Sequence, residues 1–211
     1  MQLKQPSTKA IICALTALMM ITFVTTTTTH SNVSASPAAS ASPKTGEMAP
    51  DFTLKDQTGA EVKLSSLRGK VVVLEWTNPT CPFVVRHYKA KTMTQLASAH
   101  PEAVWLTINS SYFTKDADNA KWAKTEGVKQ VLNDASGEVG KRYGARTTPH
   151  MYVIDAQGKL AYQGAIDDDP YGDKSAPVNY VSEALKALKD GVAIKVNETK
   201  AYGCSVKYKS R

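Results

Sequence analysis

The sequence holds few cysteines and no closely spaced pair of them. Only three occur among its 211 residues, at Cys13, Cys81 and Cys204. Without a second cysteine near Cys81 there is no haem attachment motif and no paired-cysteine copper site. The histidines, including His87 six residues after Cys81, show no ligand spacing relative to a cysteine. We therefore expect neither a metal ion nor an organic cofactor.

The chain also lacks a run of basic residues interleaved with aromatic ones. Its formal net charge is +7, but the lysines are spread along the whole chain, as at Lys121, Lys129 and Lys186. Such a distribution is typical of a solvated basic surface rather than of a nucleic-acid-binding segment. We expect no nucleic-acid partner.

No apolar run reaches the ~20 residues that a membrane-spanning helix needs. Ala10–Val24 has 15 residues without a charge and follows Lys4 and Lys9. Small residues then suit cleavage after Ala35 or Ala41. This order is typical of a secretory signal peptide, and an uncleaved membrane anchor is the alternative. We predict a signal peptide over residues 1–35, export to the periplasm or the extracellular space, and no stable membrane insertion after cleavage.

Residues 36–47 contain almost no large apolar side chain. Such a segment cannot bury a face, so we predict a disordered linker there. The rest of the chain shows no internal repeat and no second linker. We expect one folded domain over residues 48–211.

The pattern of apolar residues in this domain predicts alternating strands and helices. Val71–Trp76 is rich in valine, as expected of a central strand covered on both faces. The order of elements predicts an α/β fold, with a central mixed sheet and helices on both faces. The expected strands are 52–54, 62–64, 71–76, 103–108, 128–132, 151–154 and 160–162. The expected helices are 82–98, 119–126, one from Ser136 to about Gly144, and one with Val178, Val181, Leu185 and Leu188 on its buried face.

Cys81 stands between a strand end and Pro82, a residue that suits the first turn of a helix. The start of a helix offers free backbone N–H groups and a positive dipole end, which favour a thiolate, the nucleophilic form. Arg86, His87 and Lys89 follow within two turns and could add positive potential. The alternative is a buried, inert cysteine, since cysteine is among the most buried residue types.

Thr147, Thr148, Pro149 and His150 form a second signal, directly before an expected strand. Proline lacks an N–H group, and its peptide bond is the one in which the cis form is cheap. A cis bond at Pro149 would turn the backbone of Thr148 towards a neighbouring loop.

Together these segments resemble the thioredoxin superfamily, and within it the exported redoxins called peroxiredoxin-like or AhpC/TSA-like. The resemblance covers most of the chain after the linker. It implies a thioredoxin-like fold with an N-terminal hairpin extension and a C-terminal tail. It rests on APDFTL at 49–54, CPFV at 81–84, RHY at 86–88, TP at 148–149, GAIDD at 164–168 and YGCSVKY at 202–208.

The resemblance also implies roles for single residues. Cys81 matches the attacking cysteine, Pro149 the cis-proline that faces it, and Glu75 a buried acid that moves protons during disulfide exchange. Burial in a valine-rich strand should raise the pKa of Glu75 and suit it to proton transfer; a partly wet carboxylate paired to a lysine is the alternative. The expected substrate contacts are Thr80, Thr148, His150 and Trp76.

The sequence departs from the family pattern at several positions. Val84 replaces the second thioredoxin cysteine, so Cys81 has no thiol partner on its own helix. Asn78 and Leu74 stand where peroxiredoxins have threonine and proline, and Pro149 stands where they have arginine. Arg146 or Thr80 could take the role of the arginine that this chain lacks at position 149.

Cys204, in a polar tail, is the remaining thiol that could resolve an oxidised Cys81. We expect an exported thiol oxidoreductase that acts on a protein disulfide or a peroxide and is restored by an external thiol reductant. The alternative is a non-catalytic binding module with a structural Cys81–Cys204 bridge. We interpret Asp167–Asp169 as a solvated loop, and Tyr202 and Tyr208 as packing residues of the tail.

Overall fold

The computed structural model describes residues 42–210. The expected signal peptide and most of the expected linker lie outside these residues. The last linker positions, 42–47, are ordered: the N–H of Gly46 bonds to the carbonyl of Leu160 at 2.7 Å, and that of Leu160 to Glu47 at 2.8 Å. The folded part thus begins before Met48, because main-chain pairing needs no apolar side chains. No helix within 42–210 is long and apolar enough to cross a membrane.

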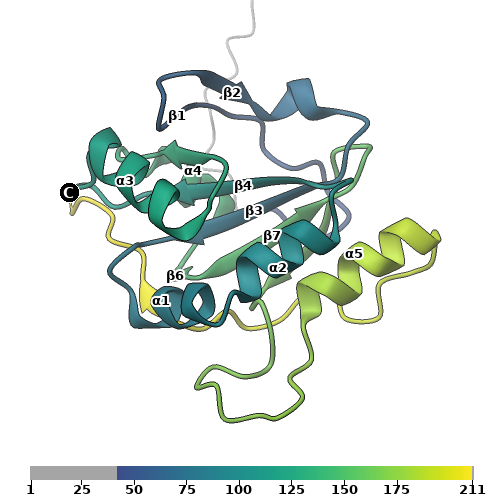
Figure 1. Ribbon diagram of the computed structural model, residues 1–211. Helices are drawn as coiled ribbons and strands as arrows, with labels where there is room; N and C mark the ends of the chain where they lie inside the picture. The colour runs from purple at the N-terminus through teal and green to yellow at the C-terminus, as the bar shows by residue number, and fades with distance from the viewer. Residues whose placement is uncertain (1–41, 211) are drawn as a thin grey trace, which may run out of the picture. The chain divides into compact units, whose positions relative to one another are not determined.

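A seven-stranded mixed sheet forms the centre of the fold (Figure 1), in the order β2-β1-β5-β4-β3-β7-β8. Strands β3, β4 and β5 are parallel to one another. On one side β7 pairs antiparallel with β3 and β8 with β7; on the other β1 pairs antiparallel with β5 and β2 with β1. The strands are β1 (Thr53–Asp56), β2 (Glu61–Lys63), β3 (Val72–Thr77), β4 (Val104–Asn109), β5 (Val131–Asn133), β7 (His150–Ile154) and β8 (Leu160–Gly164).

Strand β3 is buried along its whole length between β4 and β7. Its side chains alternate between two cores, one on each face of the sheet. Leu74 and Trp76 enter the core beneath α4 (Glu138–Tyr143), together with the N-terminal segment. Val73 enters the other core with residues of α1 (Pro82–Lys89), α2 (Thr92–Ala99) and α5 (Tyr180–Asp190). The expected mixed sheet with helices on both faces is confirmed.

The helix expected over 82–98 is broken into α1 and α2. Lys91 adopts a left-handed conformation with φ 57°, which an α-helix cannot contain. Because of this break, Val84, His87 and Tyr88 of α1 are buried together with Met93 and Leu96 of α2, while Val85 is only half-buried.

Three other boundaries also differ from expectation. Helix α3 (Asp116–Glu126) starts earlier than residue 119. Strand β5 starts only at Val131, because the N–H of Val128 still bonds to Ala123 of α3. Val178 lies outside α5 and is exposed; Asn179 caps this helix by accepting a hydrogen bond from the Ser182 N–H at 2.8 Å.

The C-terminal tail returns to the main body as a short strand. β9 (Cys204–Ser205) pairs antiparallel with β6 (Thr147–Thr148), so that Thr148 lies opposite Cys204. In Figure 1 the yellow strand lies beside α1 and β6. The tail therefore brings the second cysteine to the end of the fold where α1 begins.

Candidate active site

Cys81 occupies the junction between β3 and α1, as the sequence predicts. It is the N-cap residue of α1, with Pro82 in the first turn. Its side chain is 2% exposed, and its Sγ donates a hydrogen bond to the carbonyl oxygen of Thr148 at 2.9 Å. The peptide bond between Thr148 and Pro149 is cis. The strand–helix junction at Cys81 and the proline loop at Pro149, both predicted from the sequence, are therefore in direct contact.

Cys204 completes this arrangement from the tail. Both cysteines are free thiols, Cys81 buried and Cys204 half-exposed, and they lie close enough that each shifts the pKa of the other. Gly203 lies so close to the Thr148 carbonyl that a Cβ at this position would stand 2.2 Å from its oxygen. A glycine is needed there because the tail backbone crosses the Thr148–Pro149 bond without room for a side chain.

The surroundings make the two thiols unequal. Burial opposes ionisation of Cys81, but its interactions with the Cys204 and Thr148 side chains and with the Val84 N–H outweigh burial and lower the pKa of Cys81. Burial and donation to Cys81 raise the pKa of Cys204 to about 11. Cys81 is thus the thiol that ionises first, as a nucleophile must, and Cys204 remains protonated beside it.

The basic residues of α1 do not surround the sulfur of Cys81. Lys89 is exposed. Burial and the charge of Arg86 lower the pKa of His87 to about 4, so His87 is neutral at neutral pH. Arg86 donates to the carbonyl oxygen of Asp169 at 2.8 Å. The acidity of Cys81 therefore arises from hydrogen bonds and the helix start rather than from an adjacent cation.

Glu75 is fully buried on the same face of the sheet as α1. Its Oε2 accepts hydrogen bonds from the Tyr88 hydroxyl at 2.9 Å and the Trp105 indole N–H at 3.2 Å, while Oε1 has no partner. Burial outweighs these bonds and raises the pKa of Glu75 to about 7. The alternative of a wet carboxylate paired to a lysine does not apply, since no ion pair of Glu75 is present in residues 42–210.

A cavity of about 550 Å³ lies next to Glu75, lined in part by its donors Tyr88, Trp105 and Thr107. The carboxyl group is thus separated from this space only by the side chains that hold it.

The remaining expected contacts divide between two locations. Thr148 lies at the cysteine pair, and Thr80 precedes Cys81 with its hydroxyl bonded to Asn78 at 2.9 Å. Trp76 is fully buried in the core on the opposite face of the sheet, where its indole bonds to Ser110 at 3.0 Å. The structure does not bring Trp76 to the thiols, because β3 alternates its side chains between the two faces.

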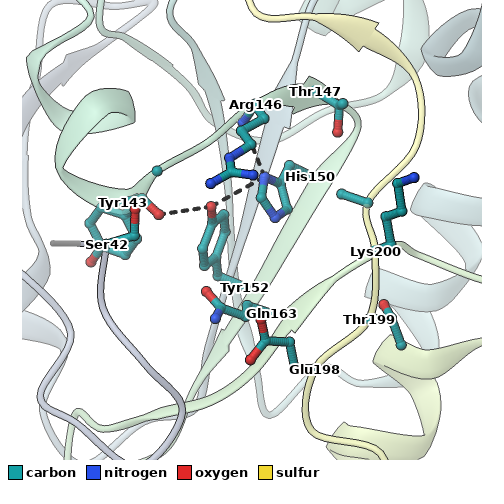
Figure 2. A pocket seen from close by; sticks show the side chains of 12 residues that line it. Ser42, Tyr143, Arg146, Thr147, His150, Tyr152, Gln163, Glu198, Thr199 and Lys200 are labelled. Carbon is teal, nitrogen blue, oxygen red and sulfur yellow. Dashed lines mark hydrogen bonds between the residues drawn. The ribbon is translucent and has the colours of Figure 1, made fainter.

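His150 also lies away from the thiols. Figure 2 shows it beside Arg146 and Tyr152 at a cavity of about 630 Å³, and neither cysteine is among the residues that line this cavity. Burial and the charge of Arg146 lower the pKa of His150 to about 4. Arg146 therefore does not stand in for the arginine that peroxiredoxins place at the cysteine. Within residues 42–210 no three His, Cys, Asp or Glu side chains are arranged to hold a metal ion.

The sequence did not predict a group of polar residues that lies beside the thiols. Tyr202, two residues before Cys204, donates a hydrogen bond to Asp167 and contacts His87. Asp167 and Asp169 are each 5% exposed, so the expected solvated loop is in fact buried. Asp169 accepts hydrogen bonds from the N–H groups of Gly172, Asp173 and Lys174. The sequence signals were GAIDD at 164–168, which contains Asp167, and YGCSVKY at 202–208, which begins with Tyr202.

Comparison with known proteins agrees with this geometry. The AhpC/TSA family profile matches residues 45–163. The chloroplastic peroxiredoxin Q of Triticum aestivum is 27% identical over 162 residues, which cover 69% of this chain and 66% of that protein. The thiol-disulfide oxidoreductase ResA of Bacillus cereus is 28% identical over 121 residues, which cover 54% of this chain and 66% of ResA. The chain thus matches just under two thirds of the length of these curated relatives.

A solved structure shares the fold of this chain. An uncharacterized conserved protein from Geobacillus kaustophilus superposes with a TM-score of 0.72 at 26% identity, covering 80% of this chain and 94% of that one. The family profile runs from ahead of β1 into β8 and includes both Cys81 and Pro149. The chain is therefore a member of the AhpC/TSA family, with the thioredoxin fold.

Proposed function

We propose that this protein is an exported thiol oxidoreductase that alternates between a Cys81/Cys204 dithiol and a disulfide. The observation that carries the proposal is the position of these two free thiols beside cis-Pro149: Sγ of Cys81 bonds to the carbonyl oxygen of Thr148, and Thr148 is the residue that pairs with Cys204. Names of relatives lend support, since both a peroxiredoxin and a thiol-disulfide oxidoreductase are among them.

With a disulfide as oxidant, Cys81 thiolate attacks one sulfur of the substrate. The bond from Cys81 to that sulfur forms, the substrate disulfide breaks, and its other half leaves as a thiolate that takes up a proton. Cys204, once deprotonated, then attacks Sγ of Cys81, which forms the Cys81–Cys204 bond and releases the second half of the substrate. The substrate is reduced by two electrons, and the protein is oxidised by two.

With a hydroperoxide, the same thiolate attacks the terminal oxygen. An S–O bond forms, the O–O bond breaks, and the alkoxide or hydroxide leaves with a proton. Cys204 then attacks the sulfenic acid, so that the S–O bond breaks, water leaves and the disulfide forms. An external thiol reductant restores the dithiol in either case.

Glu75 is proposed as the group that handles the proton of this cycle. A carboxyl group with a pKa of about 7 exchanges its proton readily near neutral pH. Its donor Tyr88 belongs to the helix that Cys81 begins, and the cavity behind Tyr88 gives the proton an exit. Glu75 makes no hydrogen bond to either thiol, so the transfer needs an intervening water.

Export follows from the expected signal peptide at residues 1–35, and it agrees with a disulfide-forming pair, which persists outside the reducing cytosol. The competing proposal is a binding module with a static bridge. The burial of Cys81, which is 2% exposed, favours this alternative, because a catalytic thiol must be reachable by its substrate.

Turnover of the two single-cysteine variants separates these proposals. We expect Cys81→Ser to abolish oxidation by both hydrogen peroxide and a disulfide, and Cys204→Ser to stop at a trapped Cys81 adduct that mass spectrometry identifies. A binding module predicts instead that wild type and both variants are equally inert, and that oxidation changes only the melting temperature.

A further inference from the structure

The thiol pair lies beside a buried polar cluster that the proposed chemistry does not use. The Tyr202 hydroxyl donates to Oδ1 of Asp167, and its oxygen lies 2.9 Å from Nε2 of His87 and 3.5 Å from Nη2 of Arg86. Arg86 also lies 3.1 Å from Nε2 of His87 and donates to the carbonyl oxygen of Asp169 at 2.8 Å. One tail residue thus joins α1 to the loop after β8.

The ring of Tyr202 adds a second contact with α1. It packs against Phe83 with ring centroids 6.0 Å apart. Phe83 follows Cys81 by two residues, and Tyr202 precedes Cys204 by two, so this contact and the thiol contact lie side by side. The hydroxyl and the ring together fix the direction in which the tail enters the site.

Beyond Tyr202 the tail is seated on β6. Gly203 crosses the Thr148–Pro149 bond without room for a Cβ, Cys204 pairs with Thr148, and the Val206 N–H bonds to the Arg146 carbonyl at 3.0 Å. In the described residues β6 pairs with no strand other than β9. The tail thus occupies the backbone edge closest to Cys81.

An unpaired strand edge is a template for another extended polypeptide. Because Sγ of Cys81 contacts the Thr148 carbonyl, a polypeptide whose disulfide is to reach this sulfur would have to run along β6. That position is taken by residues 204–206. A small oxidant needs only a local opening at the half-exposed Cys204, whereas a polypeptide needs the whole segment to leave.

We propose that the segment Tyr202–Val206 excludes extended polypeptides from Cys81 and so selects low-molecular-weight oxidants, and that Tyr202 is the latch that holds this segment closed. This inference rests on the proposed redox function of the thiol pair. Tyr202 acts as a positioning residue, because its hydroxyl holds the tail and does not touch the reacting sulfurs. Release of the latch widens the substrate range to polypeptide disulfides.

The test keeps the chemistry constant and changes the size of the oxidant. The two oxidants are glutathione disulfide and the disulfide-linked dimer of an unstructured decapeptide; each oxidises the dithiol to the Cys81–Cys204 bond and leaves as two thiols. Their rates are measured on the reduced wild type, on Tyr202→Phe and on Tyr208→Phe. Tyr208 is the matched control, since its hydroxyl anchors the same tail through one bond, to the Ala145 carbonyl at 2.8 Å.

We expect wild type and Tyr208→Phe to react faster with glutathione disulfide than with the peptide dimer, and Tyr202→Phe to lose this selectivity. The rate with the peptide dimer should rise about tenfold in Tyr202→Phe, the effect of losing one hydrogen bond to a charged group. The latch is overturned if wild type accepts both oxidants equally, or if Tyr202→Phe keeps the selectivity of Tyr208→Phe.

A measurement that involves no redox chemistry distinguishes a wrong role for Tyr202 from a wrong redox function of the thiols. Amide hydrogen exchange at residues 204–206 should speed up about tenfold in Tyr202→Phe, since one such bond has been lost, and less in Tyr208→Phe. Unchanged exchange contradicts the latch even where the thiols turn over. If exchange is faster but the thiols react with neither oxidant, the proposed function is wrong, and so is the selection of substrates. The role of Tyr202 as the anchor of the tail is then still supported.

Discussion

Sγ of Cys81 lies 2.9 Å from the carbonyl oxygen of Thr148, a residue 67 positions further along the chain. The same Thr148 pairs with Cys204. Thr148 thus connects Cys81, the cis-proline loop and the tail that carries the second thiol. The predictions that follow depend on this three-way contact.

The acidity of Cys81 should depend on the side chain at position 204. The Cys204 thiol donates a hydrogen bond that lowers the pKa of Cys81. Cys204→Ala removes the donor and should raise that pKa, whereas Cys204→Ser retains a hydroxyl donor and should raise it less. The ultraviolet absorbance of the thiolate, followed against pH, measures both. Equal acidity of Cys81 in the two variants and wild type would show that the helix start alone sets it.

Glu75 should make stability depend on pH. Folding raises the pKa of Glu75 from 4.5 to about 7, chiefly through burial. The folded protein therefore keeps a proton that the unfolded chain releases. This contribution is complete below about pH 4.5 and is lost as the pH rises through about 7.

Glu75→Gln remains neutral and avoids this loss. The free energy of unfolding of Glu75→Gln relative to wild type should rise by roughly 2–3 kcal/mol between about pH 5 and about pH 8. Denaturant unfolding at several pH values measures the difference. Glu61→Gln, which removes an exposed carboxylate, serves as the control, and a similar slope for both variants would contradict the assignment.

Gly203→Ala should detach the tail. Its Cβ would stand 2.2 Å from the Thr148 oxygen, at φ 131°. Gly59→Ala is a matched control, because its φ is also positive, 89°, but no heavy atom lies within 4 Å of the new Cβ. We expect Gly203→Ala to cost about 1–3 kcal/mol more than the control and to slow closure of the Cys81–Cys204 disulfide. Equal closure rates in the two variants would mean that the tail approaches Cys81 by another path.

The reduction potential of the Cys81–Cys204 pair should distinguish a cycling disulfide from a static bridge. Structural disulfides of exported proteins have potentials below about −300 mV. Here the dithiol is stabilised by the hydrogen bond between the thiols and the lowered pKa of Cys81, which makes the disulfide easier to reduce. We expect a potential above about −300 mV by equilibration with dithiothreitol mixtures. A lower value would favour the static bridge.

The sequence predicted the parts of the site that rest on local chemistry. The valine-rich β3, the helix start at Cys81–Pro82 and the turn at Thr148–Pro149 carry their signals within a few residues. The pairing of Thr148 with Cys204 could not be predicted, because two-residue strands show no alternation and the contact joins residues 56 positions apart in the chain. Cys204 was a candidate because it is the remaining thiol after the linker, but only the tertiary fold brings it to Cys81.

Some residues have a role that their type does not indicate. Lys91 ends α1 in a left-handed conformation without the glycine or proline that normally marks such a break. Asp167 and Asp169 form part of an acidic run typical of a solvated loop, yet they are buried because backbone N–H groups and Tyr202 satisfy them. His150 and Trp76 are close to site residues in sequence, but strand alternation places their side chains elsewhere.

The strand that carries Cys204 comes after every strand of the main sheet and after α5 in chain order. A chain made from its N-terminus can therefore build the sheet and place Cys81 before its partner thiol has been synthesised. Until β9 pairs with β6, Cys81 lacks the neighbouring thiol with which it could form a disulfide. Pairing of the tail with β6 is thus the folding step that places a second thiol beside Cys81.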